Sequence, residues 1–487
     1  MKYALIAFDH ENPLQHANEI NLGAVEVIAK CLQRALHSIN GQLEEDYLCS
    51  LLLMVFRCSD ACAVATVEKE GATFLPLTLA LTSRYRERPS SIRCYFTAKQ
   101  LTNRICELGL SLHRLRNSDI VLLSIVRNLR RESSSVAAKL LAGLTVHRES
   151  KALAMRFPGL LEAVVERACA SSCGQCALVL HNLAWESSNK AEMGRKRGLL
   201  EAVGRLTRVT SDITRATAYA TLGFLSTDAS NRIPILKVNS GNLLKNSLVE
   251  LCKEADGGAK IHVIRMLCNL ISSQTAKTIA MMPGLLRCLI RTAQEQGDVE
   301  IATVAAKVVR NLAGHISVRD SSHPAVVDAL LKMAQSTKLE VVLWTARGFV
   351  EQSLQIDSSF FIVRSPKVLY TILQLSASKQ PKVAALGVEV LANLSRDSSN
   401  AKRLTTNGRV LSGLVDHLQT TTTENEDARR QAVRAALYLA SHKSTSRLIA
   451  KQFDMIPSLS RYGTSNDEDV DLKKAALHGV VMLAPSM

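Results

Sequence analysis

A short phrase recurs along the chain, each time at the end of an apolar stretch. The copies are LLAGLT from position 140, VLHNLA from 179, TLGFLS from 221, MLCNLI from 266, VVRNLA from 308, VEQSLQ from 350, VLANLS from 390, AALYLA from 435 and VVMLAP from 480. Measured at the Asn of Asn-Leu or its equivalent, successive copies are 39, 42, 45, 42, 42, 40, 45 and 44 residues apart. A period near 42 falls in the range of helical repeats of roughly 40–47 residues. The chain is therefore predicted to be a repeat array.

A second apolar stretch follows each phrase after a gap of 13 to 17 residues, and a Gly or Pro commonly leads it. Examples are GLLEAVGRL from Gly198, PGLLRCLIRT from Pro283 and GRVLSGLVDHL from Gly408. Gly or Pro at such a place ends one helix and lets the next begin at a sharp angle. Each repeat is therefore predicted to hold several helices, and the fold class is all-α.

A small side chain stands six residues before the Asn position in most repeats. This position holds Ala137, Cys176, Ala218, Ala305, Gly387 and Ala432, with the larger Val263 in one repeat. A small residue lets neighbouring helices approach closely, as stacked repeats require. Arg347 breaks the pattern, which predicts looser packing or a shift by one residue in that repeat.

This pattern resembles the armadillo repeat, in which a short first helix and a Gly-led second helix precede a long third helix ending in A-x-x-A-L-x-N-L. The resemblance implies a right-handed α-solenoid of armadillo-type repeats with three helices per unit. It covers residues 116–487, or about eight to nine units. HEAT repeats are the nearest structural alternative, but they usually lack the Asn-Leu phrase.

Residues 1–115 are expected to form an N-terminal helical cap with one or two degenerate repeats. The cap itself is assigned to residues 1 to about 46, because a terminal repeat must present a polar outer face. Between residues 47 and 81, Gly71 stands in the inter-helix position and Val55 or Phe56 in the anchor position.

The composition agrees with a helical array and limits the classes of partner that the chain could bind. Apolar residues make up 47% of the 487 residues but aromatic ones only 4%, and no apolar run reaches the length of about 18 residues that a transmembrane helix needs. The formal charge of +16 is spread along the chain. Such a field suits an acidic protein, a nucleic acid or an anionic lipid surface.

Twelve cysteines lie scattered in apolar stretches without the spacing of a disulfide scaffold. Reduced thiols of this kind indicate a cytoplasmic or nuclear protein. Cys169, Cys173 and Cys176 form the densest cluster and include a C-x-x-C pair, which raises a metal or redox site as one hypothesis. The alternative is that Cys176 packs at the small-residue position and that the cluster has no reactive role.

By the resemblance, the third helices line a concave groove, and the Asn of each Asn-Leu faces it to pair with the backbone of an extended peptide. The matching residues are Asn182, Asn269, Asn311 and Asn393, and the series is interrupted at Gly143, Phe224, Ser353 and Tyr438. The alternative is that these amides cap a helix or satisfy a turn carbonyl.

The groove should also be basic. Arg265, Lys307 and Arg434 stand four residues before the Asn position, and Arg310 adjoins Asn311. Residues four apart share one helical face. Proteins similar to β-catenin use a comparable basic groove for acidic, partly extended partners, whereas the tryptophans that importin-α-like proteins place at the same position are missing. The alternative is that these cations are ordinary solvated side chains.

No Gly-rich phosphate loop, metalloprotease motif, serine-hydrolase motif or paired-acid constellation occurs in the sequence, so we predict neither an enzyme nor a cofactor. The expected function is a non-catalytic scaffold or adaptor that binds an extended acidic protein segment. The alternatives are a basic solenoid that associates with nucleic acid or an anionic membrane, and an adaptor of nuclear-transport type.

Overall fold

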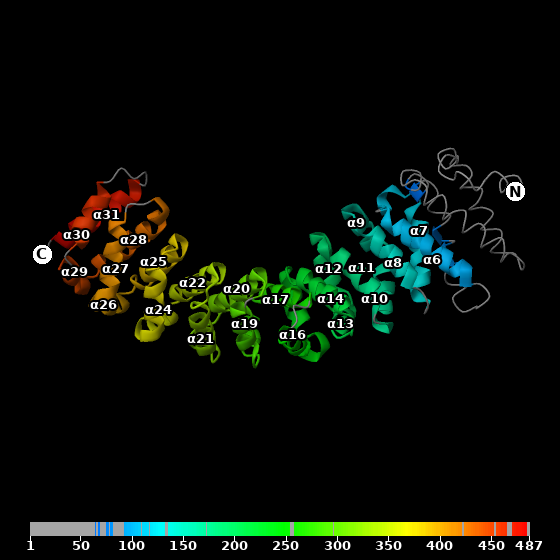
Figure 1. The fold of residues 1–487 in the computed structure, drawn as a ribbon, viewed down its shortest axis with the longest axis horizontal. Helices are drawn as coiled ribbons and strands as arrows, with labels where there is room; N and C mark the ends of the chain where they lie inside the picture. Colours follow the sequence, from blue (N-terminus) through cyan, green and yellow to red (C-terminus); the bar gives the residue numbers. More distant parts are fainter. Residues whose placement is uncertain are drawn as a thin grey trace, which may run out of the picture. The chain divides into compact units, whose positions relative to one another are not determined.

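The computed structural model describes residues 92–484, apart from short gaps at 109, 116, 132–134, 172, 254–257, 296, 421–422, 452–453 and 465–469, together with a few residues between 64 and 80. The expected cap at residues 1–46 and the anchor at Val55 or Phe56 lie outside the described residues. Figure 1 shows the described helices in chain order, from α6 (Ile92–Glu107) to α31 (Val470–Leu483). Within the described helices, none is long and apolar enough to cross a bilayer.

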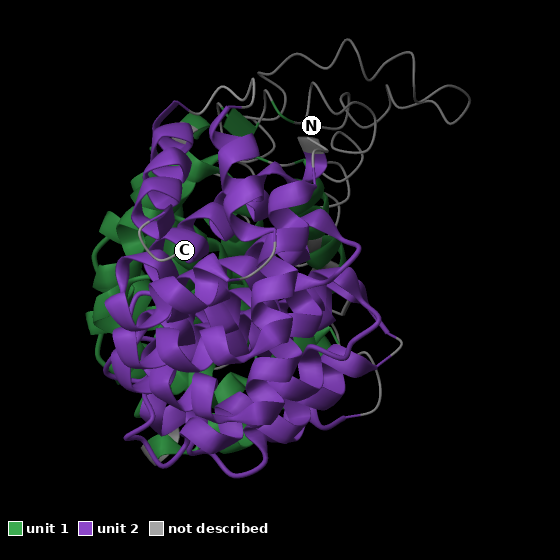
Figure 2. Ribbon diagram, turned by 90° about the vertical axis from the view of Figure 1, so that its left-hand side faces the viewer, with its two compact units in different colours: residues 1–246, 257–262 green, residues 247–256, 263–487 purple. Residues whose placement is uncertain are grey.

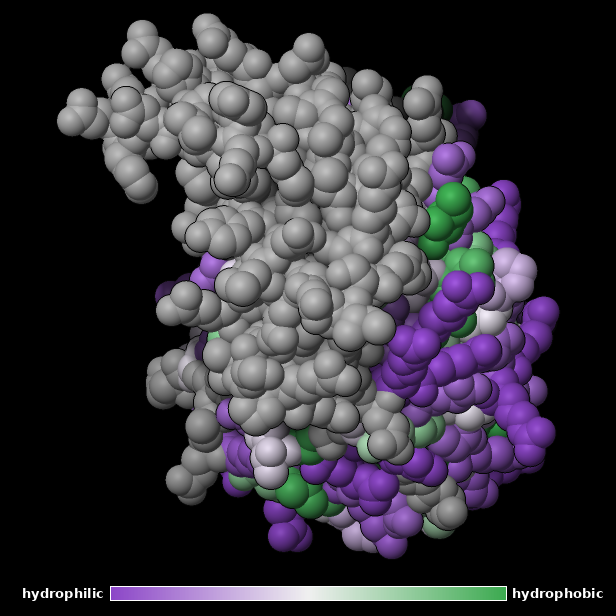
Figure 3. All heavy atoms as spheres, turned by 90° about the vertical axis from the view of Figure 1, so that its right-hand side faces the viewer, coloured by the Kyte–Doolittle hydropathy of each residue, from purple (hydrophilic) through white to green (hydrophobic). Residues whose placement is uncertain are grey.

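The chain divides into two compact units (Figure 2). Unit 1 comprises residues 1–246 and 257–262, and unit 2 comprises residues 247–256 and 263–487. In the part of the chain that the structure describes, every regular element is a helix. The face seen in Figure 3 is mostly hydrophilic where it is coloured, and its apolar residues form small separate patches.

The recurring phrase closes the third helix of each repeat, as predicted. These helices are α8 (Ser135–Leu144), α11 (Gly174–Trp185), α14 (Asp212–Leu225), α17 (Ala259–Leu270), α20 (Val299–His315), α22 (Leu339–Leu354), α25 (Pro381–Leu394), α28 (Glu426–Ser441) and α31. In unit 1, α6, α8, α11 and α14 pack in succession, and in unit 2 α20, α22, α25, α28 and α31 do the same. Each unit therefore has a continuous layer of third helices.

The second helices of the repeats likewise follow one another in each unit. They are α7 (Ser118–Arg130), α10 (Leu160–Ala170), α13 (Leu199–Leu206), α16 (Leu243–Leu251), α19 (Leu285–Gln294), α21 (His323–Met333), α24 (Pro366–Ser376), α27 (Gly408–Gln419) and α30 (Met455–Gly463). The glycines that precede α10 and α19, Gly159 and Gly284, have φ of 78° and 85°. Glycine adopts this left-handed conformation without steric cost, which explains the Gly-Leu-Leu sequence at these corners.

Short first helices connect the layers. They are α9 (Arg148–Arg156), α12 (Lys190–Arg195), α15 (Arg232–Leu236), α18 (Ala276–Ala280), α23 (Ile356–Arg364), α26 (Ser398–Thr406) and α29 (Lys443–Ala450), with 3-10 turns η2 (Leu112–Arg114), η3 (Ser187–Asn189), η4 (Ala229–Asn231), η5 (Val238–Gly241) and η6 (Thr423–Asn425). The repeat between α20 and α22 departs from the pattern. The long α20 leads through a non-helical segment, residues 316–322, directly into α21, so this repeat has two helices.

The small-residue position is buried wherever it occurs. Ala137, Cys176, Ala218, Ala305 and Ala432 are each fully buried. Gly387 makes the closest approach, because a Cβ atom there would lie 2.4 Å from the backbone nitrogen of Ser376 in α24. Helices α24 and α25 therefore pack backbone against backbone, which any larger residue would prevent.

We expect Gly387→Ala to destabilise unit 2 by about 1–3 kcal/mol, because backbone atoms of Ser376 cannot move aside as a flexible side chain would. Gly413→Ala in α27 is the matched control, since a Cβ there meets nothing within 4 Å. Its expected effect is a gain of about 0.5–1 kcal/mol from helix propensity. Urea denaturation followed by circular dichroism measures the free energy of unfolding of both variants. Equal changes in the two variants would contradict the close approach at Gly387.

Candidate functional site

The Asn side chains singled out in the sequence bridge consecutive third helices. Asn182 Nδ2 donates to the Ala142 carbonyl of α8 at 3.0 Å and to Thr145 Oγ1 at 3.3 Å. Asn393 Nδ2 donates to Ser353 Oγ of α22 at 3.0 Å. These bonds satisfy polar groups in the last turn of the preceding helix, which has no intrahelical partner for its carbonyls.

Asn311 bonds through both ends of its amide, and its Nδ2 end bridges to the preceding third helix. Its Nδ2 lies 3.3 Å from the Cys268 carbonyl and 3.2 Å from the Cys268 sulfur of α17, and its Oδ1 accepts a bond from Arg310 Nη1 at 3.1 Å. Asn269 occupies the equivalent position of α17 and is half-buried. Asn182 and Asn311 thus satisfy carbonyls, as the alternative to peptide binding proposed, and the contact of the four amides with a bound peptide stays a prediction.

The repeat that lacks a first helix is shifted by one residue. Gln352, rather than Ser353, takes the place of the Asn, and its Nε2 donates to the Ala313 carbonyl and to the Ile316 carbonyl at 2.9 Å. His323 Nε2 lies 2.9 Å from Gln352 Oε1. The small position six residues before Gln352 is then Ala346, which is fully buried. The shift resolves the break at Arg347, whose side chain is exposed.

Sequence reasoning missed a second polar position. A Ser, Thr or Asn follows the Leu of every phrase but the last by five or six residues and is buried in seven repeats: Ser150, Asn189, Asn231, Thr275, Ser359, Asn400 and Thr445. Asn189 Nδ2 donates to the Leu183 carbonyl at 3.0 Å, and Asn231 Nδ2 to the Leu225 carbonyl at 3.1 Å. Thr275 Oγ1 and Thr445 Oγ1 donate in the same way to the Leu270 and Leu439 carbonyls, so these four side chains cap the third helix of their own repeat. Ser150 and Asn400 instead bond to the preceding repeat. The recurring spacing was a signal that could have found them.

Two of the predicted groove cations are paired with carboxylates. Arg265 forms an ion pair with Glu300 of α20, and Arg310 forms one with Glu351 of α22. Arg434 Nη1 donates to Gln431 Oε1 at 2.7 Å. Burial raises the pKa of the nearby Glu389 carboxyl, while the charge of Arg434 opposes that rise. The third-helix face of unit 2, formed by α17 from Val263 onward with α20, α22, α25 and α28, thus alternates in charge.

Lys307 differs from these cations, because it lies on an aromatic ring. Its Nζ is 4.7 Å from the centroid of Trp344, and the guanidinium carbon of Arg347 is 4.3 Å from the same ring. Both distances are within the range of cation–π attraction, about 6 Å. Among the described residues neither cation has a carboxylate partner. Neither Trp344 nor Arg347 was predicted as a groove residue, although they stand three residues apart and so share a helical face.

Unit 1 carries an aromatic cluster on its third helices. Trp185 of α11 packs edge-on against Phe224 of α14 with ring centroids 4.8 Å apart, and His181 lies 5.2 Å from Phe224. Trp185 is 60% exposed. Burial, with smaller effects from His262 and Lys151, lowers the pKa of His181 to about 4. The described third-helix face of unit 1 thus carries an aromatic cluster with Lys151 at its edge, Nζ 5.9 Å from the Trp185 centroid, whereas that of unit 2 alternates in charge.

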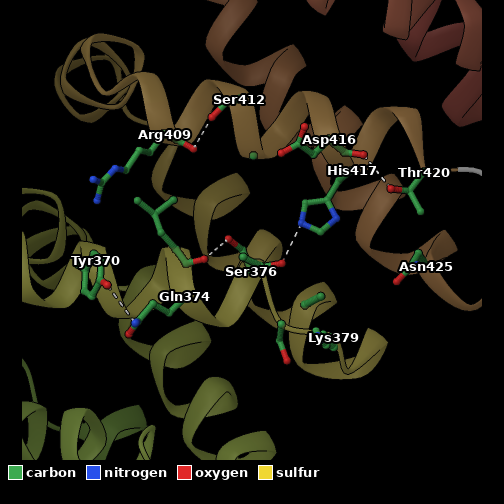
Figure 4. Close-up of a pocket in the computed structure, with 15 residues that line it drawn as sticks. Tyr370, Gln374, Ser376, Lys379, Arg409, Ser412, Asp416, His417, Thr420 and Asn425 are labelled. Carbon is green, nitrogen blue, oxygen red and sulfur yellow. Dashed lines mark hydrogen bonds between the residues drawn. The ribbon is translucent and has the colours of Figure 1, made fainter.

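A polar pocket of about 550 Å³ lies on the second helices of unit 2. Tyr370 and Gln374 of α24 and Arg409 and Asp416 of α27 line it (Figure 4). His417 Nε2 lies 2.9 Å from the Ser376 carbonyl across it, also seen in Figure 4. This surface belongs to another helix layer than the third-helix face, so it offers positions for control substitutions.

The described side chains of the cysteine cluster do not come together as a set of metal ligands. Throughout the described ranges, no three His, Cys, Asp or Glu side chains come together as metal ligands. Cys176 is fully buried at the small-residue position, and Cys169 and Cys173 are half-buried.

No family model matches the sequence, and no curated protein does. Solved structures do match. An engineered protein aligns over 94% of this chain and 98% of its own, with 18% identity and a TM-score of 0.51. A chain from a study of a phosphorylation switch in the interaction between cadherin and β-catenin aligns over 89% of this chain and 91% of its own, with 17% identity and a TM-score of 0.53. The predicted all-α solenoid of armadillo type is confirmed as the fold.

Removing the Asn182 amide tests the bridging role. We expect Asn182→Ala to lower the free energy of unfolding by about 1–2 kcal/mol, because the Ala142 carbonyl loses one of its two donors and Thr145 Oγ1 also loses a donor. Ser412→Ala, at an exposed position of α27, should stay within about 0.5 kcal/mol of wild type. Unchanged stability in Asn182→Ala would favour the peptide-binding reading instead.

Acidification should destabilise the protein between pH 6.5 and about 4 through His181. Its pKa falls from 6.5 to about 4 on folding, so in this window the unfolded chain binds a proton that the folded protein does not. We expect His181→Phe to lose less stability than wild type when urea denaturation is compared at pH 7 and pH 5. Identical losses would show that His181 titrates alike in both states.

Proposed function

We propose that this protein is a non-catalytic scaffold of the cytoplasm or nucleus that binds an extended, acidic protein segment across the third-helix face of unit 2. The observation that carries this proposal is the group formed by Lys307, Trp344 and Arg347. Two cations flank one half-buried indole, and in the described structure neither is neutralised by a carboxylate. An acidic side chain placed there would be attracted by two positive charges and would contact the apolar face of the indole.

Tryptophan and arginine are the residues that most often dominate the energy of protein interfaces. A Trp344 ring held by cations on α20 and α22 is already ordered, so binding costs little side-chain entropy. A basic segment would meet the two cations with like charge, which disfavours it. This charge arrangement supports an acidic partner over a basic one.

The spacing of the helices suggests which side chains of such a segment would be bound. Packed helices lie about 8–10 Å apart, and an extended chain rises about 3.3 Å per residue. Arg265, Lys307 and Arg347 stand on the successive third helices α17, α20 and α22. A segment that crosses these helices would therefore meet a cation about every third residue. Arg265 would exchange its pairing with Glu300 for a carboxylate of the partner.

Fluorescence anisotropy with two labelled peptides tests the proposal. One peptide carries Glu at every third position among Gly and Ser, and the other has Gln at the same places. We expect the Glu peptide to bind more tightly. We also expect the double substitution Lys307→Glu with Arg347→Glu to weaken it at least tenfold, which corresponds to about 1.4 kcal/mol.

The control variant makes the same change of charge on the second helices. Lys379→Glu with Arg409→Glu alters two residues of the pocket between α24 and α27. It should leave the affinity for the Glu peptide within about twofold at physiological salt, where charges beyond about 8 Å are screened. Equal losses in both variants, with a steep dependence on salt, would indicate general attraction to polyanions. That result would favour the nucleic-acid or anionic-membrane alternative.

A further inference from the structure

Cys173 and Cys176 meet at the start of α11. Cys173 is the N-cap residue, with φ −74° and ψ 105°, and Cys176 lies in the first helical turn. The Cys176 backbone N–H donates to the Cys173 carbonyl at 3.1 Å. Residues three apart at a helix start share one face, so the Cys173 and Cys176 side chains lie next to each other. The chain thus brings two thiols together by local structure alone.

The two thiols differ in exposure. Cys173 is half-buried, whereas Cys176 is fully buried beneath it. A dissolved oxidant can therefore reach Cys173 and not Cys176. In a C-x-x-C pair this arrangement gives the accessible thiol the role of nucleophile and leaves the buried thiol to react with it afterwards.

The surroundings favour the thiolate at Cys173. Hydrogen bonding from the Cys176 thiol, then from the Cys176 and Gln175 amides, lowers the pKa of Cys173 to about 6, and the Arg167 guanidinium of α10 adds to the effect. The same pairing, together with burial, raises the pKa of Cys176. Burial also raises the pKa of Cys106 to about 11 and that of Cys268 above its usual range. Of these four described thiols, Cys173 alone is shifted toward the thiolate.

We propose that Cys173 and Cys176 form a reversible dithiol–disulfide pair that is oxidised by hydrogen peroxide. The Cys173 thiolate attacks one peroxide oxygen, the O–O bond breaks, and hydroxide leaves, so that Cys173 becomes a sulfenic acid. The Cys176 sulfur then attacks the Cys173 sulfur, the S–OH bond breaks, and water leaves as the disulfide forms. In total two thiols are oxidised and one peroxide is reduced to two waters.

The pairing explains why a cysteine stands where other repeats hold alanine. Ala137, Ala218, Ala305 and Ala432 fill the equivalent position, so packing alone does not require sulfur at Cys176. The substitution Cys176→Ala is accordingly expected to fold. It removes the resolving thiol and leaves Cys173 in place.

Mass spectrometry of the full-length protein tests the pair. Reduced protein is treated with hydrogen peroxide, alkylated and digested with trypsin, which releases residues 168–190 with all three cysteines of the cluster. We expect this peptide to lose the mass of two hydrogens, with fragmentation placing the bond between Cys173 and Cys176. The Cys169→Ser variant should behave in the same way.

The variants separate the roles of the two thiols. Cys176→Ala should stop at the sulfenic acid, which dimedone traps on Cys173, and Cys173→Ser should give neither product. Alkylation of Cys173 by iodoacetamide should be half-maximal near pH 6. A disulfide that involves Cys169 would overturn the proposal, as would a peptide that keeps both thiols while exposed Cys252 is oxidised.

Discussion

The close approach of neighbouring helices is the constraint on which the rest of this structure depends. A repeat buries its apolar stripe only against the helices beside it, and one contact between a second and a third helix, Gly387 against the Ser376 backbone, leaves no room for a Cβ. Alanine, cysteine or, in one repeat, valine fills the same position elsewhere and is fully buried. Where the third helices pack on one another, the last turn of one faces the side chains of the next. The polar groups at that seam must then be paired, because water is excluded from it.

The bridging amides follow from this requirement. Asn182, Asn393 and Gln352 donate to groups in the preceding third helix, each about one repeat away along the chain. Capping residues such as Asn189 and Asn231 serve the carbonyls of their own repeat. These polar residues therefore bond within and between repeats. A partner would contact other side chains, which lie exposed or half-buried on the third helices. In unit 2 these include the Lys307–Trp344–Arg347 group, and in unit 1 they include Trp185.

Charge on the third-helix face shows how far residue type alone can mislead. Arg265, Lys307, Arg310 and Arg434 appear as one basic series in the sequence. In the structure, Arg265 and Arg310 meet Glu300 and Glu351, which stand 35 and 41 residues further along the chain. The carboxylates were visible in the sequence, but their pairing depends on which turns of neighbouring helices lie side by side. Lys307 escapes this neutralisation because Trp344, rather than a Glu, faces it.

The repeat period, the all-α class and the small-residue position could be predicted from the sequence. They depend on local periodicity and on side-chain size, and both can be read in each repeat by itself. The resemblance to the armadillo repeat, which implied the solenoid fold, rested on the same features. The break at Arg347 predicted either looser packing or a shift by one residue, and the tertiary structure decided for the shift from Ser353 to Gln352. Tertiary structure alone decided the missing first helix before α21 and the pairing of each Asn and Arg. Those outcomes depend on contacts between residues about one repeat apart, and the register of one helix against the next is set by packing in three dimensions.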